Sequence, residues 1–494
     1  MQAEACKARA PSPSRTAMKN DNVILGIDLG TSAIKCVAMS VSGKVMATTE
    51  AAFPLTRELP GQAEQNPLDW LAALEAAVKQ FDADVAKQVS AIGLTGQLPT
   101  LVCLEGDRPL PSAITWMDSR ADTWASGILD ERKRQMIYER TGMPIDGRYL
   151  APMFRHHLDC FGKGVTTILS AKDFLHFALT GELATDPSTA AGYGLYDLDG
   201  KSWASDLCAI WGVDTSLLPA IRPAEATSPL RDDVATRLGL PAGAPVAVGC
   251  ADSVASVYAM AGLGSGTVCV TTGSSTIIMD SLRDPLRDPQ RRYLLTPHAV
   301  DGVFGREMDL LSTGTSYRWL NDLLGWDNGR IDAAAATSQA GANGLMFSPY
   351  LAGGEQGALW NPNLRGVLHG LTVQHKAQDI ARAYLEGVQF EIRRCIDILA
   401  ETSKIERVVL AGHAVSHVST RQMLADILGR PVVSYHHSSP AAIGAALLAI
   451  PQAERPAPTA SQTDVVAPSV ISTNYEKIYR RYSALFPAIA EASD

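Results

Sequence analysis

The chain has 494 residues and a formal net charge of −9, which allows two or three domains and disfavours nucleic acid or an anionic membrane as its main partner. No apolar run approaches the roughly 20 residues that a membrane-spanning helix needs. The eight cysteines are scattered without a C-x-x-C pair, which indicates a reducing compartment, the cytoplasm, and no zinc site.

The N-terminal segment, residues 1–22, is polar and basic and lacks the apolar core of a secretory signal, so we expect a disordered extension. Three strands are predicted next, at 23–29, 34–40 and 44–53. A helix near 68–82 follows, because its apolar residues recur at helical spacing.

Strands and helices alternate through the rest of the chain, which predicts an α/β fold with mixed sheets. We expect strands at 89–96, 101–104, 113–116 and 245–250, and helices at 121–141, 170–179, 253–262, 376–402 and 418–428.

A boundary near residue 263 divides the predicted structure into a first domain over 23–262 and a second over 263–454. The segment 452–472 is rich in Pro, Ala and Thr and reads as an exposed linker. Within the terminal part, 455–494, an amphipathic helix over 474–486 should pack back on a lobe.

Two turns share one pattern, in which a small hydroxyl-bearing turn around one glycine separates two apolar strands. The first is Gly30-Thr31-Ser32 and the second is Gly273-Ser274-Ser275. Such a turn exposes backbone N–H groups, a geometry that suits a phosphate. Ordinary β-hairpins would show the same pattern. As phosphate turns, the two copies indicate two related domains that grip one polyphosphate between them.

Acidic residues stand at the ends of two predicted strands. Asp28 precedes the first turn, whereas Thr271 occupies the matching position before the second, so Asp28 is the candidate to hold a metal ion among phosphates. Asp252 follows the predicted strand 245–250 and precedes a helix. Catalytic groups gather at such strand ends, but a helix N-cap would look the same.

Other strand ends carry residues that suit a sugar and a nucleotide base. Gln97 ends one strand, and Trp116-Met117-Asp118-Ser119-Arg120 ends the next, which offers an apolar face and partners for hydroxyls. An exposed Asp118–Arg120 turn pair is the alternative. The turn Gly412-His413-Ala414 follows a strand, and small residues there would let a flat ring such as adenine lie against the backbone; a plain strand–helix connection would look similar.

In order, these segments resemble the FGGY carbohydrate kinases, which belong to the actin/hexokinase/Hsp70 ATPase superfamily. The resemblance runs from about residue 23 to 488 and is closest to the xylulokinase branch. The matching segments are 26–32, 94–97, 171–181, 185–197, 249–252, 266–279, 349–353, 361–371 and 423–431. The resemblance implies a two-lobed ribonuclease H-like α/β fold with its active site in the cleft between domains.

Carried over by position, the resemblance implies ATP and Mg²⁺ as cofactors. Asp252 would be the catalytic base, and Asp28 would lie near Mg²⁺ and the phosphates. The implied nucleotide contacts are Gly30, Thr31, Ser32, Gly273, Ser274, Ser275, Gly314, Gly412, His413 and Ala414. The implied sugar contacts are Gln97, Leu98, Trp116, Asp118, Asp252 and Ser253.

Several positions depart from the family pattern. His413 stands where a glycine is usual, Leu98 and Pro99 replace Met-His in the first sugar loop, and Ser253 follows Asp252 where Asn or Gln is common. The segment 354–358 reads Gly-Glu-Gln-Gly-Ala instead of Gly-Glu-Arg-x-Pro.

The resemblance implies phosphorylation of a primary hydroxyl of a neutral sugar, with D-xylulose expected first. Ribulose, erythritol, glycerol and gluconate are alternative acceptors. A non-catalytic sensor of sugar or nucleotide, and an actin- or Hsp70-like ATPase, are rival functions. The expected partners are a small-molecule sugar and ATP, and the sequence leaves the oligomeric state open, a homodimer included.

Overall fold

Two seven-stranded sheets, one in each half of the chain, organise the structure. The computed structural model describes residues 22–162, 164–310, 313–351, 357–361, 363–457 and 464–493. The predicted disordered extension lies outside the described residues except for Asn22, and so does the segment 352–356, which holds most of the altered Gly-Glu-Gln-Gly-Ala motif.

The first sheet has the order β14-β15-β5-β1-β2-β3, and β16 also pairs with β5. Its strands are β1 (Val23–Leu29), β2 (Ala33–Ser40), β3 (Val45–Ala52), β5 (Val89–Gly96), β14 (Thr227–Pro229), β15 (Pro245–Ala247) and β16 (Cys250–Ala251). β1 is antiparallel to β2 and parallel to β5.

The second sheet repeats this arrangement, with the order β19-β20-β18-β17-β23-β24-β25. Its strands are β17 (Thr267–Thr272), β18 (Thr276–Leu282), β19 (Leu294–Pro297), β20 (Phe304–Leu310), β23 (Arg407–Gly412), β24 (Val432–Ser434) and β25 (Val465–Val466). β17 is antiparallel to β18 and parallel to β23, as β1 is to β2 and β5. The two halves of the chain therefore share one topology, as the paired turns predicted.

Helices surround both sheets. Those of the first half are α1 (Pro67–Val78), α2 (Ala83–Lys87), α3 (Asp122–Ile128), α4 (Glu131–Thr141), α5 (Leu150–Phe161), α6 (Ala171–Thr180), α7 (Pro187–Ala191), α8 (Ser205–Trp211), α9 (Asp232–Leu238) and α10 (Asp252–Ala261). Those of the second half are α11 (Thr313–Leu324), α12 (Asn328–Thr337), α13 (Ala377–Ala400), α14 (Val418–Leu428), α15 (Pro440–Ala449) and α16 (Ser472–Ser493). No helix within the described ranges has both the length and the apolar character to cross a membrane.

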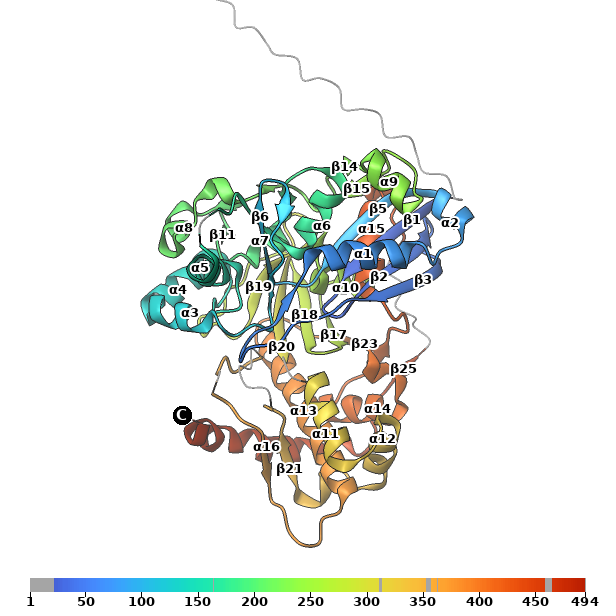
Figure 1. Ribbon diagram of the computed structural model, residues 1–494. Helices are drawn as coiled ribbons and strands as arrows, with labels where there is room; N and C mark the ends of the chain where they lie inside the picture. The colour runs from blue at the N-terminus through green and yellow to red at the C-terminus, as the bar shows by residue number, and fades with distance from the viewer. Residues whose placement is uncertain are drawn as a thin grey trace, which may run out of the picture.

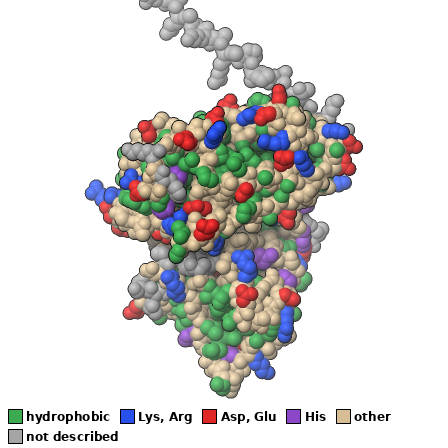
Figure 2. Space-filling view, in the orientation of Figure 1, with side chains coloured by type: hydrophobic (Ala, Val, Ile, Leu, Met, Phe, Trp, Pro, Cys, Tyr) green, Lys and Arg blue, Asp and Glu red, His purple; other side chains and the backbone are tan. Residues whose placement is uncertain are grey.

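Figure 1 shows two lobes: the first sheet lies in the upper half with α1, α10 and α15, and α11 to α14 lie in the lower half with α16. The space-filling view in Figure 2 narrows to a waist between these halves. A smaller sheet joins β6 (Thr100–Glu105) and β8 (Ala113–Thr115) with β4 (Glu64–Gln65), β7 (Arg108–Pro109) and β9 (Thr167–Ser170).

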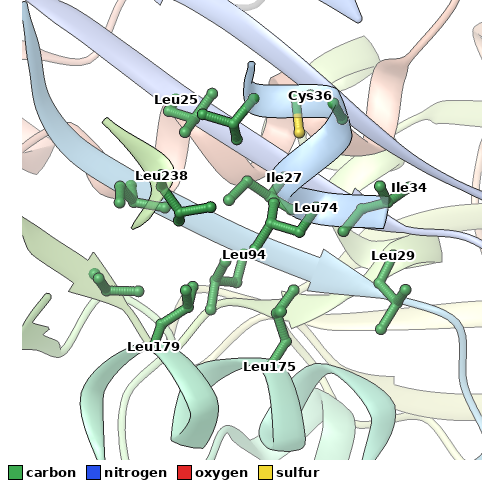
Figure 3. Close-up of a cluster of buried hydrophobic side chains, with 14 of the residues drawn as sticks. Leu25, Ile27, Leu29, Ile34, Cys36, Leu74, Leu94, Leu175, Leu179 and Leu238 are labelled. Atoms are coloured by element: carbon green, nitrogen blue, oxygen red, sulfur yellow. The ribbon is translucent and has the colours of Figure 1, made fainter. Parts of the chain in front are cut away.

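Side chains of β1 alternate between its two faces, and the two faces have different roles. Leu25, Ile27 and Leu29 point into a core shared with Leu74 of α1 and Leu175 of α6, and Figure 3 shows these side chains as members of one hydrophobic cluster. Because side chains alternate along a strand, Asp28 lies on the opposite face. The hydrophobic core therefore holds β1 in register while its last polar residue faces away from that core.

On that opposite face, α15 packs unusually close to the first sheet. A Cβ atom added to Gly26 or Gly93 would lie 1.9 or 1.8 Å from a carbonyl oxygen of α15. On the other side of α15, a Cβ on Gly444 would lie 1.9 Å from the Ala255 oxygen of α10. Glycine at these positions allows α15 to lie between the sheet and α10, which carries Asp252.

The structure corrects several predicted elements. The predicted helix 121–141 is two helices, since the Asp130 side chain caps α4. The predicted strand 245–250 is interrupted before β16, where Gly249 has a φ of +83°. Within the predicted linker 452–472, β25 pairs with β24. The C-terminal helix was predicted correctly in type but is longer, and the Tyr482 ring of α16 packs 4.9 Å from the Phe390 ring of α13.

Candidate active site

A cavity of about 290 Å³ lies between the lobes, where residues predicted from both halves of the chain meet. Its lining includes Asp28, both predicted phosphate turns, Trp116 and Asp252. A larger cavity of about 840 Å³ adjoins it and shares Trp116, Arg148 and Ser274. The fold thus brings sites more than 200 residues apart into one space.

The two turns close in similar ways. The Gly30 N–H donates to the Ala33 carbonyl at 3.1 Å, and the Gly273 N–H donates to the Ser275 carbonyl at 2.8 Å. Their residues are small, so nothing bulky covers the backbone. This is the geometry that lets a turn approach a phosphate.

Gly314 lies directly against the second turn. Its N–H donates to the Ser274 carbonyl at 2.9 Å, and a Cβ atom at this position would lie 2.4 Å from the Gly273 oxygen. Gly314 is the second residue of α11, so the positive end of this helix is directed toward the turn. Any larger residue would push α11 away from the turn.

Asp28 stands at the end of β1, opposite Lys35 of β2. Its Oδ1 atom is buried and has no hydrogen-bond partner among the described residues. Burial raises the pKa of Asp28 to about 6, and the charge of Lys35 opposes that rise. This carboxylate has an unsatisfied oxygen that a cation would satisfy.

The surroundings fit Mg²⁺ bound mainly by phosphates. Within the described parts of the chain, no group of three or more His, Cys, Asp or Glu side chains is arranged to hold a metal ion. Mg²⁺ is commonly held by one or two carboxylates together with substrate phosphates and water, rather than by an all-protein cage. Asp28 next to the two turns matches that pattern.

Asp252 is the first residue of α10, and its Oδ1 accepts the Ser253 N–H at 2.9 Å. The N-cap is Ala251, not Asp252, so the plain capping interpretation is wrong. Burial raises the pKa of Asp252 well above its ordinary value, and the negative charges of Asp28 and Glu307 raise it further. A carboxylate with a raised proton affinity lines the cavity.

A buried ionic network holds the backbone before Asp252. Lys172 Nζ lies 2.9 Å from Asp173 Oδ1 and 3.2 Å from Asp186 Oδ1, and it donates to the Val248 carbonyl at 2.8 Å. Asp186 also accepts a hydrogen bond from the Ser188 hydroxyl. The lysine therefore ties the α6 and α7 segments to the strand that leads to Asp252.

Ser188 completes the connection to Ala251. Its hydroxyl donates to Asp186 Oδ2 at 2.5 Å, and its oxygen accepts the Ala251 N–H at 3.0 Å. Ser188 also lines the cavity. The network thus fixes the residue that immediately precedes Asp252.

The predicted sugar residues divide into two groups. Trp116, Leu98 and Ser253 line the smaller cavity together with Asp252, and the Trp116 Nε1–H donates to the Thr31 hydroxyl at 3.3 Å. Gln97 is buried behind the first turn, where it donates to Gln65 at 2.8 Å. Gln65 in turn donates to the Thr31 carbonyl at 2.6 Å, so the two glutamines brace the turn.

Asp118 lines the larger cavity, and its carboxylate accepts the Ala63 N–H at 2.9 Å and the Arg120 Nε–H at 3.0 Å. Asp118 is almost fully buried, so the alternative of an exposed turn pair is wrong. Its oxygens hold the loop after β8 in shape.

The connection after β23 adjoins the second turn. Gly412 pairs with Thr272, and a Cβ at Gly412 would lie 1.9 Å from the Thr272 carbonyl oxygen. The Thr272 hydroxyl donates to the Ala411 carbonyl at 2.9 Å and accepts the Ala414 N–H at 3.0 Å. His413 is exposed, and its ring lies 6.2 Å from that of Tyr317.

Four charged residues of the smaller cavity were not predicted as site residues: Lys35, Arg148, Glu307 and Asp309. The two acids lie on β20, a stretch in which neither a strand nor a site residue was predicted. Since residues two apart on a strand share a face, the spacing of Glu307 and Asp309 was the available signal. Arg148 lies in a loop, where no periodicity would have placed it.

Comparison with known proteins agrees with this geometry. Models of the FGGY family of carbohydrate kinases match residues 23–259 (N-terminal domain) and 268–453 (C-terminal domain). A xylulose kinase of Bacillus subtilis (strain 168) is 29% identical over 437 residues, covering 86% of this chain and 87% of the relative. A gluconokinase of the same strain is 27% identical over 497 residues, covering 95% of each.

A solved structure shows the same similarity. The ligand-bound xylulose kinase from Lactobacillus acidophilus aligns with a TM-score of 0.88 and 26% identity, covering 95% of this chain and 98% of that one. The predicted two-lobed fold with its site between the domains is thereby confirmed. This chain belongs to the FGGY family of carbohydrate kinases.

Proposed function

We propose that this protein transfers the γ-phosphoryl group of ATP to a primary hydroxyl of a sugar, and that D-xylulose is the preferred acceptor, giving D-xylulose 5-phosphate. The observation that carries the proposal is that one cavity is lined by a small-residue turn from each lobe and by Asp252. In this assignment, the domain over 23–262 binds the sugar and the domain over 263–454 binds the nucleotide. The cytoplasmic location and a homodimer stay predictions of the sequence.

The two turns and Gly314 would hold the phosphates. Backbone N–H groups at Gly30–Ser32 and Gly273–Ser275 are in place before the reaction, so they stabilise developing charge without reorganising. The connection Gly412-His413-Ala414 would lie against adenosine, since it adjoins the second turn through Thr272. Asp28 would hold Mg²⁺, which supplies charge neutralisation between the β- and γ-phosphates.

Asp252 would accept the proton of the attacking hydroxyl. It lines the same cavity as the turns, and the Lys172–Asp186–Ser188 network holds the backbone before it. The exposed part of Trp116 gives the cavity one apolar side, which suits the C–H face of a sugar. Closure of the lobes would exclude water and limit wasteful hydrolysis of ATP.

The engaged cations favour a neutral sugar over a sugar acid, and the xylulokinase-like segments of the sequence favour a ketopentose. The cation expected near the sugar, Arg120, is bound to Asp118, and Arg148 is paired with Asp146 at 2.5 Å. The similar xylulose kinases and gluconokinases match this chain at comparable identity, so the relatives alone do not choose between them. Gln97 and Asp118, which were expected to touch the sugar, would act by shaping the walls of the sugar cavity.

The test is a comparison of kcat/KM for D-xylulose, D-ribulose, L-ribulose, glycerol, erythritol and gluconate, with ADP release as the readout. We expect D-xylulose to rank first. If another acceptor ranks far above it, the kinase assignment holds and the sugar assignment fails. If ATP binds but no acceptor is phosphorylated, the non-catalytic sensor becomes the better account.

Asp28→Ala should impair the use of Mg-ATP more than the binding of sugar. The reason is that Asp28 offers a buried oxygen without a hydrogen-bond partner in the described structure, and it lies beside the first turn. We expect the Mg²⁺ concentration for half-maximal rate to rise at least about tenfold, the loss of one charge-assisted ligand. Titration of Mg²⁺ in steady-state kinetics measures this, and sugar affinity by calorimetry is the control. An unchanged Mg²⁺ dependence would remove Asp28 from the metal site.

A further inference from the structure

Glu307 brings a carboxylate from the second lobe into the sugar end of the cavity. It lies on β20, where it is opposite Met279 of β18 and Leu294 of β19. The second turn adjoins Leu310, three residues farther along β20. At about 3.3 Å per residue, Glu307 is about 10 Å from the strand end beside that turn. It therefore lies away from the phosphate end.

The neighbours of Glu307 belong to the acceptor side of the cavity. The Thr296 hydroxyl donates to Glu307 Oε2 at 3.0 Å. The side chain of Ser253, next to the proposed base, also hydrogen-bonds to Glu307. Thr296, Ser253 and Glu307 all line the smaller cavity. A ligand whose hydroxyl reaches Asp252 would extend past this carboxylate.

Glu307 is buried without a compensating cation. Glu307 is only 8% exposed, and its carboxylate makes no ion pair with any residue in the described ranges. Burial raises its pKa, and the two hydroxyl groups oppose that rise. The adjacent Arg306 points to the other face of β20 and pairs with Asp280. A buried carboxylate that lacks a cation is costly unless further donors satisfy it.

The cations of the cavity are engaged elsewhere. Arg148 pairs with Asp146, and Lys35 stands opposite Asp28 at the phosphate end. Within the described residues, neither cation forms an ion pair or a hydrogen bond with Glu307. The remaining capacity of the Glu307 carboxylate is therefore directed at whatever occupies the cavity.

We propose that Glu307 is a specificity-determining residue of the acceptor site, which accepts a hydrogen bond from a sugar hydroxyl and rejects acceptors that carry a carboxylate there. The proposal rests on the proposed function, since it assumes that the cavity holds the sugar. A hydroxyl donates to the carboxylate, whereas a sugar carboxylate has no hydrogen to donate and adds a like charge. The second lobe would then select the sugar as well as bind the nucleotide.

We expect the protein to discriminate strongly between an acceptor with a hydroxyl facing Glu307 and an acceptor with a carboxylate there. A site built to receive a hydrogen bond rejects analogues that cannot supply it far more strongly than an apolar pocket rejects a size change. Discrimination by an unfavourable charge adds to this effect. Ligands that share one end and differ only at the other isolate the contribution of Glu307 to this specificity.

The experiment compares D-xylulose with D-xylonate, which share C3 to C5 and differ at the other end: xylonate carries a carboxylate at C1 and a hydroxyl in place of the C2 ketone. Their Kd values are measured by calorimetry on the whole protein with Mg²⁺ and a non-hydrolysable ATP analogue. We expect the wild type to bind D-xylulose at least about 100-fold more tightly. Glu307→Gln should narrow this ratio at least about tenfold, because the amide is neutral and can donate to a carboxylate.

Glu406→Gln is the matched control. It removes the same charge from an exposed site of the second lobe, where Glu406 pairs with Lys404, and it should leave the ratio unchanged. Thermal unfolding and binding of the ATP analogue establish that each variant is folded. The wild-type ratio alone tests the proposal if Glu307→Gln does not fold.

The outcomes separate this proposal from the proposed function. Equal or tighter binding of D-xylonate by the wild type, or an unchanged ratio in folded Glu307→Gln, overturns the role of Glu307. In the second case, phosphorylation of D-xylulose would still support the kinase assignment. If the wild type binds neither ligand, the role of Glu307 is also overturned, and the acceptor panel decides separately whether the protein is a kinase.

Discussion

Asp252→Asn is expected to lower kcat at least about 100-fold, the lower range for loss of a general base. Asparagine keeps the size of the side chain but has little affinity for a proton. It can still accept the Ser253 N–H with its amide oxygen, so the start of α10 should stay as it is. The cavity shape and sugar binding should therefore persist while transfer slows.

Steady-state kinetics with the preferred sugar measures the loss, and calorimetry of sugar binding is the control. Because asparagine keeps the hydrogen bond from the Ser253 N–H, a purely structural role for Asp252 predicts little change in kcat for this variant. A kcat within a few-fold of the wild type would show that another group takes the proton. A parallel loss of sugar binding would show instead that the cavity had changed shape.

Lys172→Met is expected to destabilise the fold by about 3–5 kcal/mol, the cost of removing one partner from a buried ion pair. The Lys172 ammonium lies between Asp173 and Asp186, and all three side chains are almost fully buried. Without the lysine, two carboxylates face each other in the core, so at least one of them must take up a proton or draw in water. Its hydrogen bond to the Val248 carbonyl is lost too.

Urea unfolding at pH 7 measures the change in the free energy of unfolding. Lys404→Met is the matched control, because Lys404 makes an exposed ion pair with Glu406 that should be worth less than about 1 kcal/mol. Activity should fall further than stability alone explains, since Asp186 and Ser188 hold the residue before Asp252. A loss below about 1 kcal/mol for Lys172→Met would mean that the network contributes little to the fold.

The local motifs were predictable because they depend on short-range rules. The two glycine-centred turns, Asp28 and Asp252 lie in or directly after strands whose apolar character is visible in the sequence, and the structure brings them to one cavity. The α/β class followed from the alternation of strands and helices, and the two-lobed ribonuclease H-like fold followed from the family resemblance. The break between α3 and α4 was missed although Asp130 is a good N-cap, since the apolar spacing continues across it.

Other parts depend on tertiary packing that periodicity does not reveal. Almost every residue of α15 is buried, so the helix has no polar face and no amphipathic signal, yet it sets the distance between the first sheet and α10. Gln97 and Asp118 had a composition suited to a sugar, but composition does not tell where a side chain points. In the structure Gln97 donates a hydrogen bond to Gln65, and Asp118 accepts hydrogen bonds from Arg120.

The charged lining was missed for a related reason. Glu307 lies in the middle of β20, whereas functional acids were sought at strand ends, and only the pairing with β18 and β19 turns it toward the cavity. Arg148 reaches the cavity from a loop, through an arrangement with Asp146 that no spacing predicts. These residues complete the charged lining of the cavity between the lobes.

Transfer of phosphate to a primary hydroxyl is tested most directly by the proton-coupled ³¹P NMR spectrum of the protein's reaction with Mg-ATP and D-xylulose. We expect a new phosphomonoester signal that grows with ADP in equal amounts and is split by two protons, as a primary ester requires. Inorganic phosphate in place of the ester, or an ester split by a single proton, would contradict transfer to a primary hydroxyl positioned by Asp252.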